Sequence, residues 1–136
     1  MLGRNSYTTA EIAAAHTMVE RQLTTFRTVA SQAGDTTSVS ALEPVFFNTA
    51  LLALDRLFVH RVRTFTGKDT NPLSEVEMLV ESLLDNDGVL REIKVIRYDP
   101  DKSVLGLQIG DRIALTADDF EELSAAFLKD VEQKSE

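Results

Sequence analysis

The sequence contains no cysteine and no tryptophan, and it has only two histidines, two tyrosines and three prolines. Without cysteine, the chain can form no disulfide, use no thiol as a nucleophile and build no cysteine-ligated metal site. The sequence also lacks a phosphate-binding loop, a glycine-rich dinucleotide turn and a nucleophile elbow. The commonest signatures of nucleotide binding and of ester hydrolysis are therefore absent.

The residues that are present are typical of one folded domain. Of the 136 residues, 43% are hydrophobic and 26% are charged, and a chain of this length can bury a core without disulfides. We expect a single domain over residues 1–136, with fraying at residues 1–6 and 133–136. Asp55 and Arg56 interrupt the most apolar segment, which argues against a membrane span. With no secretory pattern at residues 1–10, the expected location is the cytoplasm.

The charges are unevenly distributed along the chain. The formal net charge is −8, which disfavours broad binding to nucleic acid or to an anionic membrane. Residues 56–68, however, contain four basic residues and no acidic one, whereas residues 111–136 contain eight acids and three bases. The basic segment therefore either receives an anion or pairs with acidic segments of the same chain.

Three helices are predicted in the first two thirds of the sequence. A capping box at Thr8 and Glu11 starts the first helix, and apolar residues at helical spacing continue to Ala33. A second capping box at residues 40–43 precedes an apolar helix that runs to Phe65. The third helix is predicted from Asn71-Pro72, an N-cap followed by proline, to residue 85. The short link between the two long helices predicts an antiparallel pair.

The apolar period then changes from 3.6 to 2 residues. Residues 93–98, 104–109 and 112–115 predict a three-stranded antiparallel meander. A capping box at Thr116 starts a C-terminal helix. The predicted fold class is therefore α+β, with three N-terminal helices (two of them long and antiparallel), a three-stranded antiparallel meander and a C-terminal helix. Two long helices in so small a chain also predict a homodimer.

A basic face on the second helix is the main candidate binding site. At spacings of four and three residues, Arg56, His60 and Arg63 share one side of a helix. The predicted ligand-binding residues are Arg56, His60, Arg63, Lys68, Asp69 and Asn71. Arginine grips a phosphate or a carboxylate with its planar fork, so this face predicts binding of a small anionic ligand or an acidic partner. In the alternative, Arg56 and Arg63 pair with Glu75, Glu77 or Glu81 of the next helix as a surface ion-pair network.

Both histidines are also candidates for catalysis. Antiparallel pairing of the first two helices places His16 at the height of Asp55, whose carboxylate would orient the imidazole as a general base. A metal site would add Glu20 and His60 to His16. The sequence has no Glu-x-x-His pair of the kind found in di-iron bundles, and we therefore predict no metal and no cofactor.

The stretch Arg56-Leu57-Phe58-Val59-His60 resembles the HEPN family, small helical proteins whose ribonuclease members carry arginine and histidine on one helix. The resemblance covers these two residues, at a spacing shorter than the family's own. It implies a metal-independent ribonuclease that uses Arg56 and His60. The function predicted from the residues is instead a small non-enzymatic interaction or regulatory protein with a basic face on its second helix, and the ribonuclease is the alternative.

Overall fold

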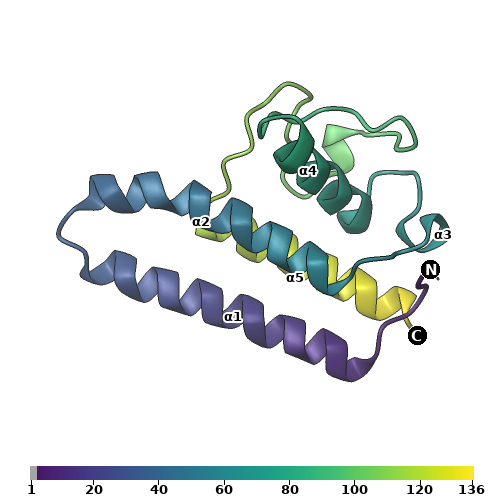
Figure 1. Ribbon diagram of the computed structural model, residues 1–136, viewed down its shortest axis with the longest axis horizontal. Helices are drawn as coiled ribbons and strands as arrows, with labels where there is room; N and C mark the ends of the chain where they lie inside the picture. Colours follow the sequence, from purple (N-terminus) through teal and green to yellow (C-terminus); the bar gives the residue numbers. More distant parts are fainter. Residues whose placement is uncertain (1–2) are drawn as a thin grey trace.

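The computed structural model describes residues 3–136 and is helical throughout its regular parts (Figure 1). Its elements are α1 (Thr9–Gln32), α2 (Thr36–Leu57), α3 (Arg63–Thr66), α4 (Pro72–Asp85), a 3-10 turn η1 (Pro100–Lys102) and α5 (Ala117–Lys134). The long helices α1 and α2 form an antiparallel hairpin, as predicted. Against this hairpin, α5 packs along both helices, and α4 packs on α2 and α5.

The predicted α+β fold class is wrong. No strand is present among residues 3–136, where 63% helix makes the fold a helical bundle. The three segments predicted as a meander run instead as an extended loop between α4 and α5. The predicted fraying of residues 1 and 2 lies outside the described residues.

The loop between α4 and α5 is held by side chains of the helices, which take the place of neighbouring strands. On α4, Glu75 accepts hydrogen bonds from the backbone N–H groups of residues 104 and 105, at 2.7 and 3.0 Å. On α2, Asn48 donates to the carbonyl of Ile113 at 2.9 Å and accepts from the N–H of Leu115 at 3.1 Å. The helices therefore satisfy backbone groups that a strand partner would otherwise satisfy. Backbone hydrogen bonds from Leu90 to Asp111 and from Ile113 to Gly88 add a short contact within the loop, without forming a strand.

Two glycines also interrupt the predicted meander. With φ angles of +69° and +96°, Gly106 and Gly110 adopt a backbone that an L side chain rarely takes. The first falls inside the segment predicted as the middle strand, and the second turns the chain so that its N–H bonds to the carbonyl of Leu90. Gly106 therefore breaks the run of extended residues that the predicted middle strand requires, whereas Gly110 lies at the predicted turn between the last two strands.

The starts of three helices follow the local signals in the sequence. The Thr8 hydroxyl accepts from the N–H of Glu11, whose carboxylate accepts from the N–H of Thr8. Asn71 caps α4, and Thr116 caps α5 through the same reciprocal bonding with Asp119. The three predicted N-termini are confirmed.

At its N-terminus, α2 departs from the prediction. The helix begins at Thr36, before the predicted capping box at residues 40–43. Asp35 provides the cap, since its carboxylate accepts from the N–H groups of residues 37 and 38 at 3.0 and 3.2 Å. The hairpin is therefore longer at its connecting end than the sequence pattern indicated.

The C-terminus of α2 is also earlier than predicted, at Leu57 rather than near Phe65. Phe58 leaves the helical conformation, and His60 has a φ of +68°. The Tyr7 hydroxyl contacts the carbonyl oxygens of residues 58 and 59 at 3.1 and 3.0 Å. Burial raises the pKa of this hydroxyl above its usual value, so it stays protonated and donates at neutral pH. A segment far away in the sequence thus fixes where α2 ends.

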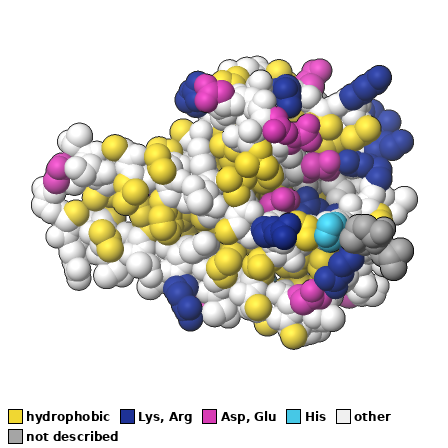
Figure 2. All heavy atoms as spheres, viewed as in Figure 1, with side chains coloured by type: hydrophobic (Ala, Val, Ile, Leu, Met, Phe, Trp, Pro, Cys, Tyr) yellow, Lys and Arg dark blue, Asp and Glu magenta, His cyan; other side chains and the backbone are white. Residues whose placement is uncertain are grey.

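The connecting end of the hairpin projects beyond the rest of the bundle (Figure 1). The start of α5 lies level with Glu43 and Arg27, because Glu43 accepts from the N–H of Ala117 and Arg27 pairs with Asp118. Residues 28–42 continue past this point, and we call them the arm. In Figure 2, hydrophobic side chains spread over this part of the molecule, whereas charged side chains gather at the opposite end.

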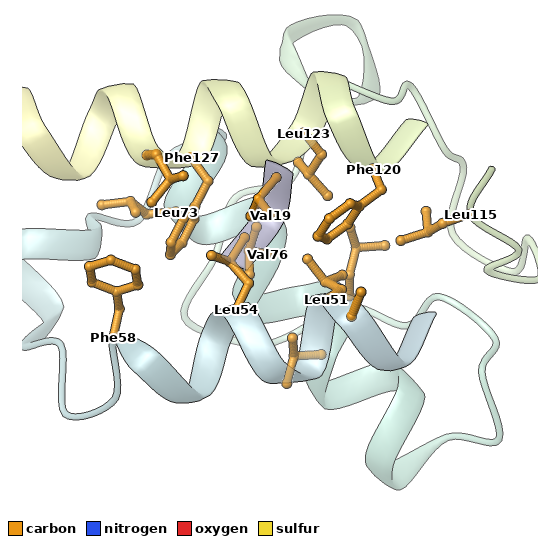
Figure 3. Close-up of a cluster of buried hydrophobic side chains, with 14 of the residues drawn as sticks. Val19, Leu51, Leu54, Phe58, Leu73, Val76, Leu115, Phe120, Leu123 and Phe127 are labelled. Atoms are coloured by element: carbon orange, nitrogen blue, oxygen red, sulfur yellow. The ribbon is translucent and has the colours of Figure 1, made fainter. Parts of the chain in front are cut away.

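The core lies where α1, α2, α4 and α5 meet (Figure 3). Its largest fully buried side chains are Phe47, Phe58, Phe120, Phe127, Leu51, Leu54, Leu73, Met78, Leu79, Leu115, Leu123 and Leu128. Of the apolar stripe expected on the second helix, Phe47, Leu51 and Leu54 are buried on α2, whereas Phe58, Val62 and Phe65 lie beyond its end. The side of α2 that faces away from this core remains largely exposed.

By length and composition, α2 is also the one described helix that could cross a membrane. Its best 18-residue window has a mean hydropathy of 1.3, with 22% of its residues buried, so the argument from Asp55 and Arg56 against a span was too strict. Core helices of soluble proteins pass the same test. In the bundle, Phe47, Leu51 and Leu54 of this helix are fully buried.

Candidate functional site

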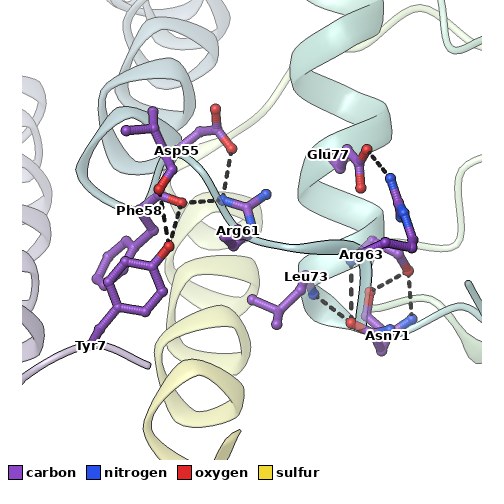
Figure 4. Close-up of polar contacts among 10 residues, drawn as sticks. Tyr7, Asp55, Phe58, Arg61, Arg63, Asn71, Leu73 and Glu77 are labelled. Carbon is purple, nitrogen blue, oxygen red and sulfur yellow. Dashed lines mark hydrogen bonds and ion pairs between the residues drawn. The ribbon is translucent and has the colours of Figure 1, made fainter. Parts of the chain in front are cut away.

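Polar side chains converge on a cavity between the end of α2 and the side of α4 (Figure 4). The cavity has a volume of about 220 Å³. Its lining residues are Asp55, Phe58, Val59, His60, Arg61, Arg63, Thr66 and Glu77. Two arginines and two acids thus face one small space, with an imidazole at its edge.

Arg61 is the most buried charged group of the cavity, with a side chain only 7% exposed. Its Nη1 donates to Asp55 Oδ1 at 3.1 Å and to the Phe58 carbonyl at 3.0 Å. The guanidinium also lies 5.3 Å from the ring centre of Phe127, a cation–π contact. Its Nε is buried and has no hydrogen-bond partner among residues 3–136. Leaving a buried donor unsatisfied costs about 1–3 kcal/mol, and Arg61 keeps one such N–H group without an acceptor in the described chain.

Arg63 enters the cavity from α3 and is already paired. Its Nη2 donates to Glu77 Oε2 at 2.7 Å, and its Nη1 donates to the Gly67 carbonyl at 2.9 Å. Of the ion pairs predicted between the basic face and the next helix, the pair of Arg63 and Glu77 is therefore present. Neither Glu75, which is buried and holds the loop after η1, nor Glu81, whose nearest cation is Arg91 at 3.9 Å, forms such a pair in the described chain.

The six predicted ligand-binding residues are not brought together as one group. Because α2 ends at Leu57, the helical spacing of Arg56, His60 and Arg63 does not apply, and only the last two line the cavity. Arg56 and Lys68 are exposed and form no ion pair within the described chain. Asp69 pairs with Arg97 at 2.9 Å, and Asn71 is used as the cap of α4.

The predicted catalytic pair of His16 and Asp55 is also separated in the structure. His16 lines a groove between α1 and α5, together with Glu20 and Arg27. Asp55 instead faces α4 and bonds to Arg61. Within residues 3–136, no group of three His, Asp or Glu side chains is placed to hold a metal ion.

Sequence reasoning missed Arg61, which it counted only as part of the local positive charge. The one signal was its position between the apolar residues Phe58, Val59 and Val62, which is unusual for a cation on a solvent-facing helix. Its burial depends on the early end of α2, which the local sequence does not reveal.

Comparison of the chain with protein-family models, with curated proteins and with solved structures found no match.

Proposed function

We propose that the protein is a small non-enzymatic interaction protein of the cytoplasm, which binds an acidic group of a ligand or partner in the cavity between α2 and α4. The observation that carries this proposal is the buried Nε of Arg61, which lacks a partner in the described chain and belongs to a side chain that lines the cavity. A carboxylate or phosphate oxygen is the acceptor that a guanidinium binds most strongly.

The charges around the cavity favour a carboxylate over a phosphate. Arg61 and Arg63 bring two positive charges, and Asp55 and Glu77 bring two negative charges. The cavity is therefore close to neutral before a ligand enters. A singly charged carboxylate meets less repulsion from the two acids than a doubly charged phosphate. The cavity is also smaller than the roughly 300–1,000 Å³ of sites for drug-sized ligands, which suits a single acidic group.

The Arg61 side chain supplies a direct test of this proposal. Nuclear magnetic resonance on ¹⁵N-labelled protein follows the Nε–H signal of each arginine during titration with sodium acetate, and separately with inorganic phosphate, at constant ionic strength. We expect a saturable shift of the Arg61 signal with acetate, and a weaker response to phosphate. A signal that stays in place, or that drifts without saturation, would contradict the proposal.

Two variants separate the cavity from the general charge of the protein. Arg63→Gln removes one positive charge and leaves Glu77 unpaired, and we expect it to weaken acetate binding about tenfold or more, since a charged hydrogen bond contributes about 1.5–3 kcal/mol. Arg21→Gln removes one charge from the exposed side of α1, and binding should not change. Equal affinity for acetate in both variants would rule out this cavity.

The ribonuclease alternative can be tested with the same material. It gains some support from His60, which is exposed and reaches the cavity, but Arg56 does not line the cavity among the described residues. Cleavage of a labelled RNA by the wild-type protein, lost in His60→Ala, would replace the binding proposal with an enzymatic one. Equal cleavage by both proteins, or none, would remove the ribonuclease.

A further inference from the structure

The outer side of α2 carries an apolar face that no other described element covers. Leu42 and Val45 are 47% and 64% exposed, and they line a groove with Phe46, Thr49, Ala50, Ala53 and Gln22 of α1. Val29, which is 54% exposed, lies seven residues after Gln22 and therefore on the same side of α1. We call this surface, formed by Gln22, Val29, Leu42, Val45, Phe46, Thr49 and Ala53, the hairpin face.

The hairpin face is free of charge in a protein where charge is otherwise plentiful. Residues 28–54 contain two charged residues, Asp35 and Glu43. Asp35 caps the N-terminus of α2, and Glu43 accepts a hydrogen bond from the N–H of Ala117 at the start of α5. Figure 2, which views the hairpin from the side away from α5, shows the same contrast between an apolar part and a charged end.

The arm also lacks the packing that normally stabilises helices. Helices in proteins owe most of their stability to the tertiary burial of an apolar face, but α5 starts level with Glu43 and leaves residues 28–42 as two helix ends packed on each other. Outside the arm but on the hairpin face, the Oε1 of Gln22 is buried without a hydrogen-bond partner in residues 3–136. A second surface laid on the hairpin would supply the missing contacts.

The charge of the protein indicates what kind of surface binds the hairpin face. With a net charge of −8, two copies repel each other unless they meet where charges are absent, and the hairpin face meets this condition. A helix that binds a lipid surface usually carries Lys and Arg along its polar edges, whereas residues 28–54 contain neither. The uncharged face therefore fits a second copy of this chain better than a membrane.

The hairpin is large enough for an interface at the lower end of the size range of stable dimers. The 22 residues of α2 span about 33 Å at 1.5 Å per residue. Two helices side by side present a surface about 20 Å wide, which gives roughly 660 Å² for one subunit. A stable interface of standard size buries about 800 Å² per partner, so a contact over most of the hairpin approaches this value.

We infer that two copies of the chain associate through the hairpin face and pack their α1–α2 hairpins against each other as a four-helix bundle. A two-fold arrangement brings the same face from both copies, so each residue of the face contributes twice. This inference does not depend on the proposed acid-binding cavity, because Asp55 of the cavity and Ala53 of the hairpin face point to opposite sides of α2.

Val45→Glu tests the inference, because it places a charge on the face at an exposed position. We expect the wild-type protein to sediment at twice its 15.1 kDa chain mass in analytical ultracentrifugation over a dilution series. Two buried carboxylates per dimer should raise the dissociation constant about 100-fold or more. Val95→Glu introduces the same charge at a loop valine that is 47% exposed, and should leave the dimer intact.

Circular dichroism of each variant checks that the helices are retained, and Leu42→Glu serves as the second variant if Val45→Glu does not fold. A wild-type protein that stays monomeric at the highest concentration would overturn the inference. So would a folded Val45→Glu dimer of unchanged affinity, or equal dissociation by Val95→Glu. A monomer that co-sediments with neutral phosphatidylcholine vesicles, and loses this binding in Val45→Glu, would assign the face to a lipid surface instead.

Discussion

Replacing Asn48 by alanine tests how α2 holds the segment that leads into α5. The Asn48 amide donates to the Ile113 carbonyl at 2.9 Å and accepts from the Leu115 N–H at 3.1 Å. Both partners belong to buried residues, so water cannot easily replace the lost amide. If the helix truly stands in for a strand partner, Asn48→Ala should destabilise the whole domain, because α5 packs on α1, α2 and α4.

The expected loss of stability follows from the two hydrogen bonds. Each buried backbone group left without its partner costs about 1–3 kcal/mol, and partial access to water places the sum for Asn48→Ala at about 2–4 kcal/mol. The unfolding entropy of about 2.1 cal/mol/K per residue gives roughly 0.29 kcal/mol/K for a chain of this length. The melting temperature should therefore fall by about 7–14 °C.

Thermal melts followed by circular dichroism measure this change, and hydrogen exchange of the Leu115 amide reports it locally. Thr17→Ala is the matched control, since the Thr17 hydroxyl is exposed and bonds to the Ala13 carbonyl of its own helix. We expect the control to stay within about 2 °C of the wild type. The reasoning is refuted if Asn48→Ala melts like the control and the Leu115 amide keeps its protection.

Two further predictions concern the change of stability with pH, which has opposite directions for Glu75 and Glu11. Burial raises the pKa of the Glu75 carboxyl above its ordinary 4.5, so the folded state holds this proton longer than the unfolded state, and stability falls as pH rises from about 4.5 through the raised pKa. Glu75→Gln should remove this loss of stability, as measured by the urea midpoint of unfolding from pH 4 to 7. If the midpoint changes equally with pH in the wild type and the variant, the prediction is wrong. The Arg4 guanidinium, followed by Thr8, lowers the pKa of Glu11 to about 2, so this carboxylate stabilises the fold above pH 4.5 and the effect is lost as pH falls towards 2. In Glu11→Gln, the urea midpoint of unfolding should depend less on pH between pH 4.5 and 2.5 than in the wild type. An unchanged pH dependence in this range would count against the pairing of Glu11 with Arg4.

The sequence predicted the features that depend on residues close together in the chain. The capping boxes at Thr8 and Thr116 involve residues three positions apart, and each forms as expected. The end of α2 depends instead on Tyr7, which lies 51 residues from Phe58. The helix was predicted to run to Phe65, but the distant Tyr7 hydroxyl and the left-handed backbone of His60 end it earlier.

The meander was predicted wrongly because a period of two shows only that alternate residues are buried, and does not show what covers them. Ile113 and Leu115 alternate with exposed residues in the structure too, yet the Ile113 carbonyl and the Leu115 N–H bond to the Asn48 side chain and not to a neighbouring strand. Glu75 appeared to be a solvent-facing acid of its helix for a similar reason. Its partners, 29 and 30 residues away, are in a loop whose path no local pattern indicates.

The two proposed interactions use opposite sides of α2, and their physical demands explain why they are kept apart. An interface between like-charged copies requires a surface without charges, and the hairpin face provides it between Val29 and Ala53. Acid binding requires buried cations, which destabilise a fold unless carboxylates such as Asp55 and Glu77 balance them. Because the charged groups balance each other around the cavity, they add little repulsion at the hairpin face. It follows that Arg63→Gln should leave the dimer intact, and that Val45→Glu should leave acetate binding unchanged. If either variant altered both properties, the two sites would have to be coupled through α2.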